Sequence, residues 1–334
     1  MTFNPLLLGA IDSSGGAALM TYSTTGSPTL RTHGSYTSLE FTASGSFTLL
    51  TNPNSLTFDI LVIGGAGSAG MGSAGTYGSG GGGAGGYKEW TSQTLSIAAH
   101  TVTVGAGGAS RACGTQSAGA TGSDSSFGSL TASTGGGQGN GGAMSTASSV
   151  RNGGCGGGGC SYADESTAGY VGGAGVSGYG TDGGNGNTNW PYYYSAGGGG
   201  AYYRGGYSSN YTWHGGKGVS NDWATGSDIG YAGGGGSCGY QTYGGYWQYL
   251  SALGGSQETA STVWSSADTT ADLSDGNFGA GNSGTNAWND GGSGGANKGA
   301  GGASAPAQAV NNAGFGSSGA GGSGVVVMRW VTES

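Results

Sequence analysis

Runs of consecutive glycines recur along the chain, and they restrict its folding more than any other feature. Glycine supplies 84 of the 334 residues. Each glycine inside a regular helix or strand costs roughly 0.5–1 kcal/mol relative to alanine. An ordinary helical fold is therefore excluded. The runs include those that begin at Gly80, Gly135, Gly153, Gly197 and Gly233.

The aromatic content nevertheless favours an ordered chain. Glycine at this level would by itself indicate low-complexity disorder. Disordered chains are poor in aromatic residues, whereas this one contains 8 Trp, 19 Tyr and 7 Phe, and only 7% of its residues are charged. Collagen is excluded because glycine does not occupy every third position and there are only 5 prolines.

An extended helix with three residues per turn would order the glycine runs. Its N–H and C=O groups point outward, so helices lying side by side can hydrogen-bond to one another. The missing side chains let the backbones approach, and Cα–H groups then contact carbonyl oxygens. Bulky residues would hold the backbones apart and should lie at the ends of runs, as Tyr87 and Trp90 do. The runs predict a bundle of polyglycine-II helices.

Strand patterns lie mainly near the two ends of the chain. Apolar residues alternate over 36–50, which indicates a pair of strands broken at Ser44 and Gly45. We expect a small sheet of terminal strands that joins the beginning of a domain to its end. The predicted fold is thus irregular to all-β, with a framed polyglycine bundle and almost no α-helix. The other strand candidates are 57–63, 94–104 and 324–331, and 255–278 has a weak helical pattern.

Charge and hydropathy exclude several classes of partner. The net charge is −8, spread over few residues, whereas nucleic acids and anionic membranes require clustered Lys and Arg. No apolar run approaches the roughly 18 residues that cross a bilayer, and no window resembles a secretory signal. We expect no nucleic acid, no membrane insertion and synthesis in a cytoplasm.

The four cysteines leave three alternatives open. They can be thiols, form up to two disulfides, or bind a metal. Cys155 and Cys160 form one pair, with no second pair or histidine at zinc-site spacing. We favour thiols over disulfides, and disulfides over a metal site. The other two cysteines are Cys113 and Cys238.

A literal dinucleotide-binding motif spans 65–70, directly after a predicted strand and about 20 residues before Glu89. The motif works only when a helix follows, because the helix N-terminus holds the pyrophosphate. The segment from Met71 to Gly86 has nine glycines in sixteen residues and cannot form a stable helix. We therefore predict no cofactor.

The sequence shows no recognisable arrangement of catalytic residues. The three histidines, His33, His100 and His214, lie far apart in the sequence, and acidic residues such as Asp164 and Asp268 have no evident partner. A loop-rich depolymerase could hide a pair of carboxylates. We favour the reading in which the acidic residues keep a glycine-rich surface soluble, and predict no enzyme activity.

Six segments form a recognisable pattern: Phe41 to Thr48, Phe58 to Gly65, Gly82 to Tyr87, Val102 to Gly108, Gly122 to Gly128 and Gly321 to Arg329. In order and spacing they resemble the glycine-rich tip domain of bacteriophage tail-fibre adhesins. The resemblance covers 35–334, strongly at both ends and by composition in the middle. It implies a stacked polyglycine bundle whose connecting loops, at the far end, contact the host cell surface. Residues 1–34 do not match and are expected to be an attachment segment, followed by an adhesin domain over 35–334.

Aromatic inserts between the glycine runs are the candidate binding elements. They mix Tyr and Trp with Ser, Asn and Gly, as the binding loops of antibodies do. For each ring the alternative is a small core that shields the bundle. The predicted receptor-binding residues are Trp190, Tyr192, Tyr193, Tyr194, Tyr202, Tyr203, Tyr207, Tyr211, Trp213, Tyr243, Tyr246, Trp247 and Tyr249.

The resemblance implies the receptor-binding tip of a phage tail fibre, a virion protein assembled in the host cytoplasm. The expected partners are a receptor on the host surface, either an outer-membrane protein or a glycan, and other tail-fibre proteins. A homotrimer is left open. One alternative is a structural virion or fibre component, which would bury its rings. Another is an extracellular coat or ice-binding protein of polyglycine type, which should have a flat face of regularly spaced short side chains.

Overall fold

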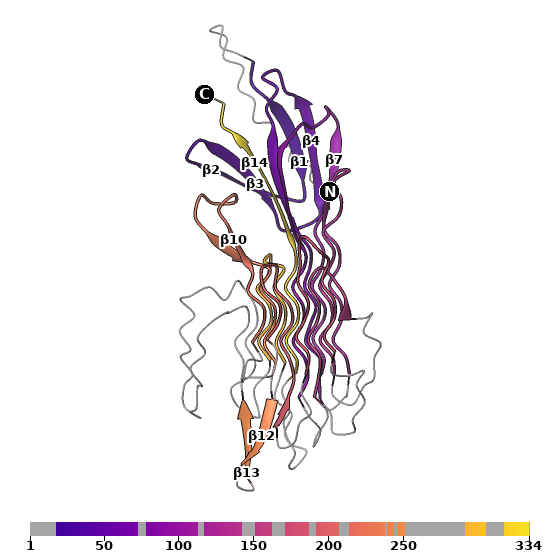
Figure 1. Ribbon diagram of the computed structural model, residues 1–334. Helices are drawn as coiled ribbons and strands as arrows, with labels where there is room; N and C mark the ends of the chain where they lie inside the picture. The colour runs from indigo at the N-terminus through magenta and orange to yellow at the C-terminus, as the bar shows by residue number, and fades with distance from the viewer. Residues whose placement is uncertain are drawn as a thin grey trace.

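Two packed β-sheets, a bundle of extended segments and a small third sheet follow one another along the molecule (Figure 1). We call the end of the bundle that meets the two packed sheets the sheet end, and the opposite end the far end. The described residues contain no α-helix. The computed structural model describes residues 18–72, 78–112, 117–141, 151–161, 171–186, 192–206, 214–237, 239–243, 246–250, 291–304 and 317–333.

A five-stranded antiparallel sheet joins the two ends of the sequence. The last strand, β14, pairs with β3 on one side and with β5 on the other, so the predicted closure by terminal strands is confirmed. In spatial order the strands are β2 (Thr29–His33), β3 (Tyr36–Phe41), β14 (Val325–Val331), β5 (Phe58–Ile63) and β6 (Tyr87–Gln93).

A four-stranded sheet packs against it, and the main core lies between them. Residues that alternate along β3 and β4, such as Leu39, Phe41, Phe47 and Leu49, are buried in this core, because successive side chains of a strand point to opposite faces. The order is β1 (Thr21–Thr25), β4 (Gly45–Thr51), β7 (Ala99–Thr103) and β8 (Ser126–Phe127).

Residues before 35 take part in both packed sheets. β1 pairs with β4 and β2 pairs with β3, and Met20 and Tyr22 are part of the core. The described residues 18–34 therefore pack with the strands that follow them. The strand expected over 94–104 is shorter, since only Ala99–Thr103 pair as β7.

The bundle shows the three-residue repeat expected of polyglycine II. Along 64–71 the partner segment of each N–H changes at every residue and returns after three, with N···O distances of 2.8–3.2 Å. The predicted bundle is confirmed. Gly64, Gly67 and Gly70 donate to 80–86; Gly65, Ser68 and Met71 donate to 117–123; Ala66 and Ala69 donate to 319–322.

The segment 80–86 lies inside the bundle with neighbours on all sides. It is fully buried, because other segments surround it and saturate its backbone. Its N–H groups donate to 134–140, 196–199 and 299–302, and its carbonyl groups accept from 64–70, 155–158 and Gly235.

Close backbone approach explains why these segments need glycine. A Cβ atom built on Gly85 would lie 1.9 Å from the carbonyl oxygen of Gly64, and one built on Gly157 would lie 1.9 Å from that of Gln138. Both are far below van der Waals contact, and backbone atoms cannot swing aside. The side chains excluded from the runs gather where the runs end, at the two ends of the bundle.

Candidate functional site

A three-stranded sheet of aromatic-rich strands lies at the far end of the bundle (Figure 1). It consists of β9 (Tyr192–Tyr194), β12 (Gly239–Tyr243) and β13 (Tyr246–Leu250), in the order β13-β12-β9. The register sets Tyr240 opposite Tyr193 on one side and opposite Tyr249 on the other. Inserts that are distant in sequence thus meet in one sheet.

The bundle itself brings these strands together. The glycine run 195–200 begins directly after β9, and the run 232–237 ends just before β12. The two runs are neighbours, because the N–H of Gly198 donates to the carbonyl of Gly235 at 3.0 Å. At the far end, Ser237 Oγ donates to the carbonyl oxygen of Ser195 at 2.9 Å. β9 and β12 are therefore neighbours in the far-end sheet because the two glycine runs next to them are neighbours in the bundle.

Seven of the predicted receptor-binding residues fall in this sheet. Tyr240 is not among the predicted residues, although the register puts it in the middle strand of this sheet. Its position in the aromatic insert is the signal that identifies it. Trp190, Tyr207, Tyr211 and Trp213 lie outside the described residues. The seven are Tyr192, Tyr193, Tyr194, Tyr243, Tyr246, Trp247 and Tyr249.

Tyr202 and Tyr203 lie at the opposite end from the one expected. Their N–H groups donate to the carbonyl of Lys217 at 2.9 and 3.0 Å, and Ala201 N–H donates to Ala232, the residue after β11, at 2.9 Å. This turn is at the sheet end, because its partners Lys217 and Ala232 flank the hairpin of β10 (Val219–Asn221) and β11 (Ile229–Tyr231), which packs against the five-stranded sheet. The two rings are 62% and 41% exposed and meet edge to face.

A hairpin from the middle of the chain covers the outer face of the five-stranded sheet. It is formed by β10 (Val219–Asn221) and β11 (Ile229–Tyr231). Trp223 from its loop and Tyr231 from β11 pack with Leu61 of β5 in a second apolar cluster. The hairpin buries the sheet face that the main core does not use.

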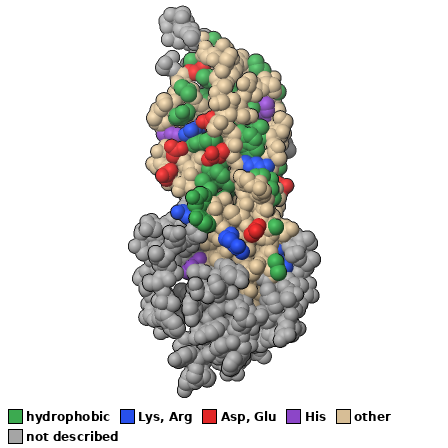
Figure 2. All heavy atoms as spheres, in the orientation of Figure 1, with side chains coloured by type: hydrophobic (Ala, Val, Ile, Leu, Met, Phe, Trp, Pro, Cys, Tyr) green, Lys and Arg blue, Asp and Glu red, His purple; other side chains and the backbone are tan. Residues whose placement is uncertain are grey.

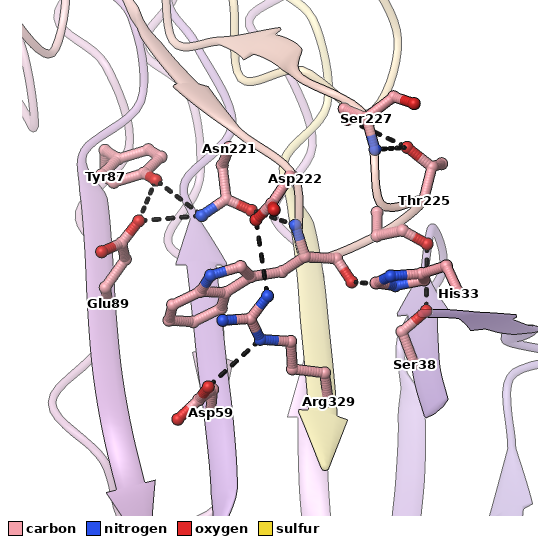
Figure 3. Close-up of polar contacts among 12 residues, drawn as sticks. His33, Ser38, Asp59, Tyr87, Glu89, Asn221, Asp222, Thr225, Ser227 and Arg329 are labelled. Carbon is pink, nitrogen blue, oxygen red and sulfur yellow. Dashed lines mark hydrogen bonds and ion pairs between the residues drawn. The ribbon is translucent and has the colours of Figure 1, made fainter. Parts of the chain in front are cut away.

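Polar contacts fix this hairpin to the sheet (Figure 3). The Arg329 guanidinium lies between the rings of Tyr36 and Trp223, with its Cζ 4.3 and 4.7 Å from their centroids. It also pairs with Asp59 at 3.1 Å and with Asp222 at 3.4 Å. One cation is thus held by two rings and two carboxylates, which is the arrangement of a structural clamp.

Further contacts extend the clamp to both sides (Figure 3). The Nε2–H of His33 donates to the carbonyl of Trp223 at 3.1 Å. On the other side, Asn221 Nδ2 donates to Glu89 Oε1 at 2.9 Å, and the Tyr87 hydroxyl donates to the same oxygen. Burial, followed by the bond to Glu89, raises the pKa of Tyr87 above its usual value. The hydroxyl therefore remains a proton donor and is no general base.

The two described cysteines lie inside the protein. Cys155 and Cys160 are buried thiols, and burial raises the pKa values of their thiols to about 12 and about 11. No cluster of three or more His, Cys, Asp or Glu side chains with metal-site geometry occurs in the described part of the chain. Cys113 and Cys238 lie outside it.

The dinucleotide-like motif is one of the bundle segments. The N–H groups of Gly65, Gly67 and Gly70 donate to carbonyls of neighbouring segments at 2.8–3.0 Å, so they are not available to a phosphate. The chain also offers no candidate for a membrane-crossing helix within the described ranges.

Most of the chain matches a known family. The family model of the glycine-rich domain matches residues 42–331. This chain belongs to that family. The match begins directly after β3 and ends at the last residue of β14, so the glycine-rich domain includes the whole described bundle and the three-stranded far-end sheet. No curated protein matches the chain.

Proposed function

We propose that this glycine-rich domain is the receptor-binding tip of a bacteriophage tail fibre, and that the far-end sheet of β9, β12 and β13 contacts the host cell. The observation that carries the proposal is the convergence of three aromatic-rich strands at the end of the bundle farthest from the packed sheets (Figure 1). Tyr and Trp provide large contact areas at low entropic cost, which suits a recognition surface.

The bundle supports this role by pre-organising the surface. Its segments are hydrogen-bonded to neighbours in several directions at each turn, so the roots of β9 and β12 are held without a ligand. Rigidity before binding lowers the entropic cost of association.

The position of the described N-terminal residues supports attachment at the sheet end. β1 and β14 both lie there, and the backbone N–H of Met20 donates to the Glu333 carboxylate at 2.7 Å. We propose that the preceding segment joins the domain to other tail-fibre proteins, in a virion assembled in the host cytoplasm. A homotrimeric fibre would present several tips and multiply a weak contact into firm adsorption.

The charge distribution supports recognition by rings and hydrogen bonds over recognition by charge. On the visible face, side chains of both signs are interspersed over the described residues (Figure 2), and the whole chain carries 8 Lys and Arg against 16 Asp and Glu. The far-end strands β9, β12 and β13 contain no Lys, Arg, Asp or Glu, so they offer no charge to a highly charged partner. An outer-membrane protein or a glycan suits such a surface.

Adsorption inhibition tests the proposal. Purified full-length chain is added to a panel of bacterial strains, and both its binding and its block of phage adsorption are measured. The variant Trp247→Ala with Tyr249→Ala should lose binding. The matched control, Tyr202→Ala with Tyr203→Ala, removes two aromatic residues at the sheet end and should retain it. Binding that survives in the first variant would reject the far-end sheet, and no binding to any strain would favour a structural fibre component.

A further inference from the structure

A groove at the sheet end lies alongside β6, the edge strand of the five-stranded sheet. Its volume is about 420 Å³, within the range of small-molecule sites, roughly 300–1,000 Å³. The groove is at the other end of the bundle from the aromatic sheet and is independent of the function proposed above. The lining residues are Tyr87, Lys88, Glu89, Trp90, Thr131, Gly178 and Tyr179.

The polar groups of the groove are held in place by the protein. Lys88 Nζ lies 3.9 Å from the centroid of the Tyr179 ring and 5.8 Å from that of the Trp90 ring. It donates to the carbonyl of Ala132 at 3.0 Å. An ammonium group has three N–H donors, so Lys88 keeps donors for a ligand while its position is fixed.

The carboxylate of Glu89 is on the other face of β6, because successive side chains of a strand point to opposite faces. Glu89 Oε1 accepts from Asn221 Nδ2 and from the Tyr87 hydroxyl, and Glu89 as a whole is exposed. A carboxylate has about four acceptor sites on two oxygens, so acceptor capacity is left for a ligand. Since β6 is the edge strand, the groove reaches both of its faces around the free edge and is lined by Lys88 and Glu89 alike. It therefore combines aromatic rings, a fixed donor, a fixed acceptor and the Thr131 hydroxyl.

The turn that carries Tyr179 into the groove is also held by backbone bonds. The N–H of Tyr87 donates to the carbonyl of Tyr179 at 2.9 Å. Gly178 has a φ of 93°, a left-handed conformation that glycine adopts without strain. The Tyr179 ring is thus presented by a defined turn beside the first residue of β6.

We propose that this groove binds a pyranose unit of a neutral saccharide. A pyranose has an apolar C–H face that stacks on an aromatic ring and a rim of hydroxyls that both donate and accept hydrogen bonds. The lining supplies rings, donors and acceptors together. The charges of the Lys88 ammonium and the Glu89 carboxylate cancel, so the groove has no net positive charge to attract a phosphate. Its polar groups also make it unsuitable for a purely aliphatic ligand.

Saturation-transfer NMR on the full-length protein tests this site with D-glucose, D-galactose and N-acetyl-D-glucosamine as probes. We expect saturation of the ring protons of at least one sugar. Tyr179→Leu and Lys88→Met should each weaken its binding about tenfold. Tyr202→Leu, which removes an exposed ring outside the groove, should leave it unchanged. No transfer to any of the three sugars, or equal binding by Tyr179→Leu, would overturn the proposal.

A measurement on the unaltered sequence keeps the test independent of folding in the variants. The indole N–H resonance of Trp90 is assigned by its loss in Trp90→Phe. Addition of the bound sugar should shift this resonance in the parent protein. Shifts confined to other tryptophans would place the sugar elsewhere and reject the groove. The far-end proposal is scored by adsorption, so either proposal can fail without the other.

Discussion

The Arg329 guanidinium stacks on the indole of Trp223, with its Cζ 4.7 Å from the ring centroid. Arg329 lies on the strand that closes the domain, and Trp223 lies in the hairpin loop inserted between two bundle segments. The contact joins the last strand of the sheets to the middle of the chain. The five-stranded sheet and the bundle should consequently unfold together, because unfolding of either one would expose the apolar cluster between the hairpin and the sheet.

Removing the indole should destabilise the whole domain. Trp223 is 7% exposed and packs in the apolar cluster outside the five-stranded sheet. Large-to-small substitutions of buried aromatic residues cost about 3–5 kcal/mol, so Trp223→Ala should lower the free energy of unfolding by about 3 kcal/mol. Urea unfolding followed by circular dichroism measures it. Tyr202→Ala, at a 62% exposed ring, should change stability by less than about 0.5 kcal/mol.

A lysine at position 329 should not stabilise the domain as well as Arg329 does, although it keeps the positive charge. Its planar guanidinium stacks between two rings and bonds to Asp59 in one fixed geometry, whereas an ammonium is a flexible point charge. We expect Arg329→Lys to cost about 1–2 kcal/mol of unfolding free energy. Arg329→Leu should cost more, because it also leaves two carboxylates without their partner. Thermal melting of the two variants gives the order, and a lysine variant that melts with the parent would show that stacking contributes nothing.

The buried thiols predict a loss of stability at alkaline pH. Burial raises the pKa of Cys155 from 9.0 to about 12 and that of Cys160 to about 11. The folded state therefore holds these protons more tightly than the unfolded state does. Their contribution to stability is fully present below pH 9 and falls as the pH rises from 9 towards 12.

Urea midpoints at pH 7 and pH 10 test this dependence. The parent should lose stability between them, and the double variant Cys155→Ala with Cys160→Ala should lose less. Below the unfolding midpoint, a thiol reagent should leave both cysteines unmodified at pH 8. Rapid labelling of Cys155 in the folded protein would contradict its burial.

The sequence predicts the strands that carry many apolar residues. Alternation over 36–50 identifies β3 and β4, and dense apolar runs identify β5 and β14, which are buried on both faces. β6 escapes detection because it is an edge strand with the polar sequence YKEWTSQ, and β1 and β2 have few apolar residues. These segments form strands because they pair with neighbouring strands, and the local sequence does not show which segments will be neighbours.

The glycine runs predict the bundle, but they do not predict at which end each insert lies. That depends on how often the chain has crossed the bundle before it. Tyr202 and Tyr203 follow one crossing and return to the sheet end, whereas the run that follows β11 leads to β12 at the far end. Tyr240 is paired with Tyr193 and Tyr249 because particular glycine runs are neighbours in the bundle. The glycine content of the sequence does not determine which runs become neighbours.

A side chain inside a run should disrupt the bundle much more than one at a turn. A Cβ on Gly157 would lie 1.9 Å from the carbonyl oxygen of Gln138, so Gly157→Val must separate two hydrogen-bonded backbones. Overpacking and lost hydrogen bonds should together cost more than about 3 kcal/mol. Gly34→Ala is the matched control: nothing lies within 4 Å of its Cβ, and its φ of 55° should cost only about 1 kcal/mol. Thermal unfolding compares the two, and a Gly157→Val variant as stable as Gly34→Ala would mean that this segment is not closely packed in solution.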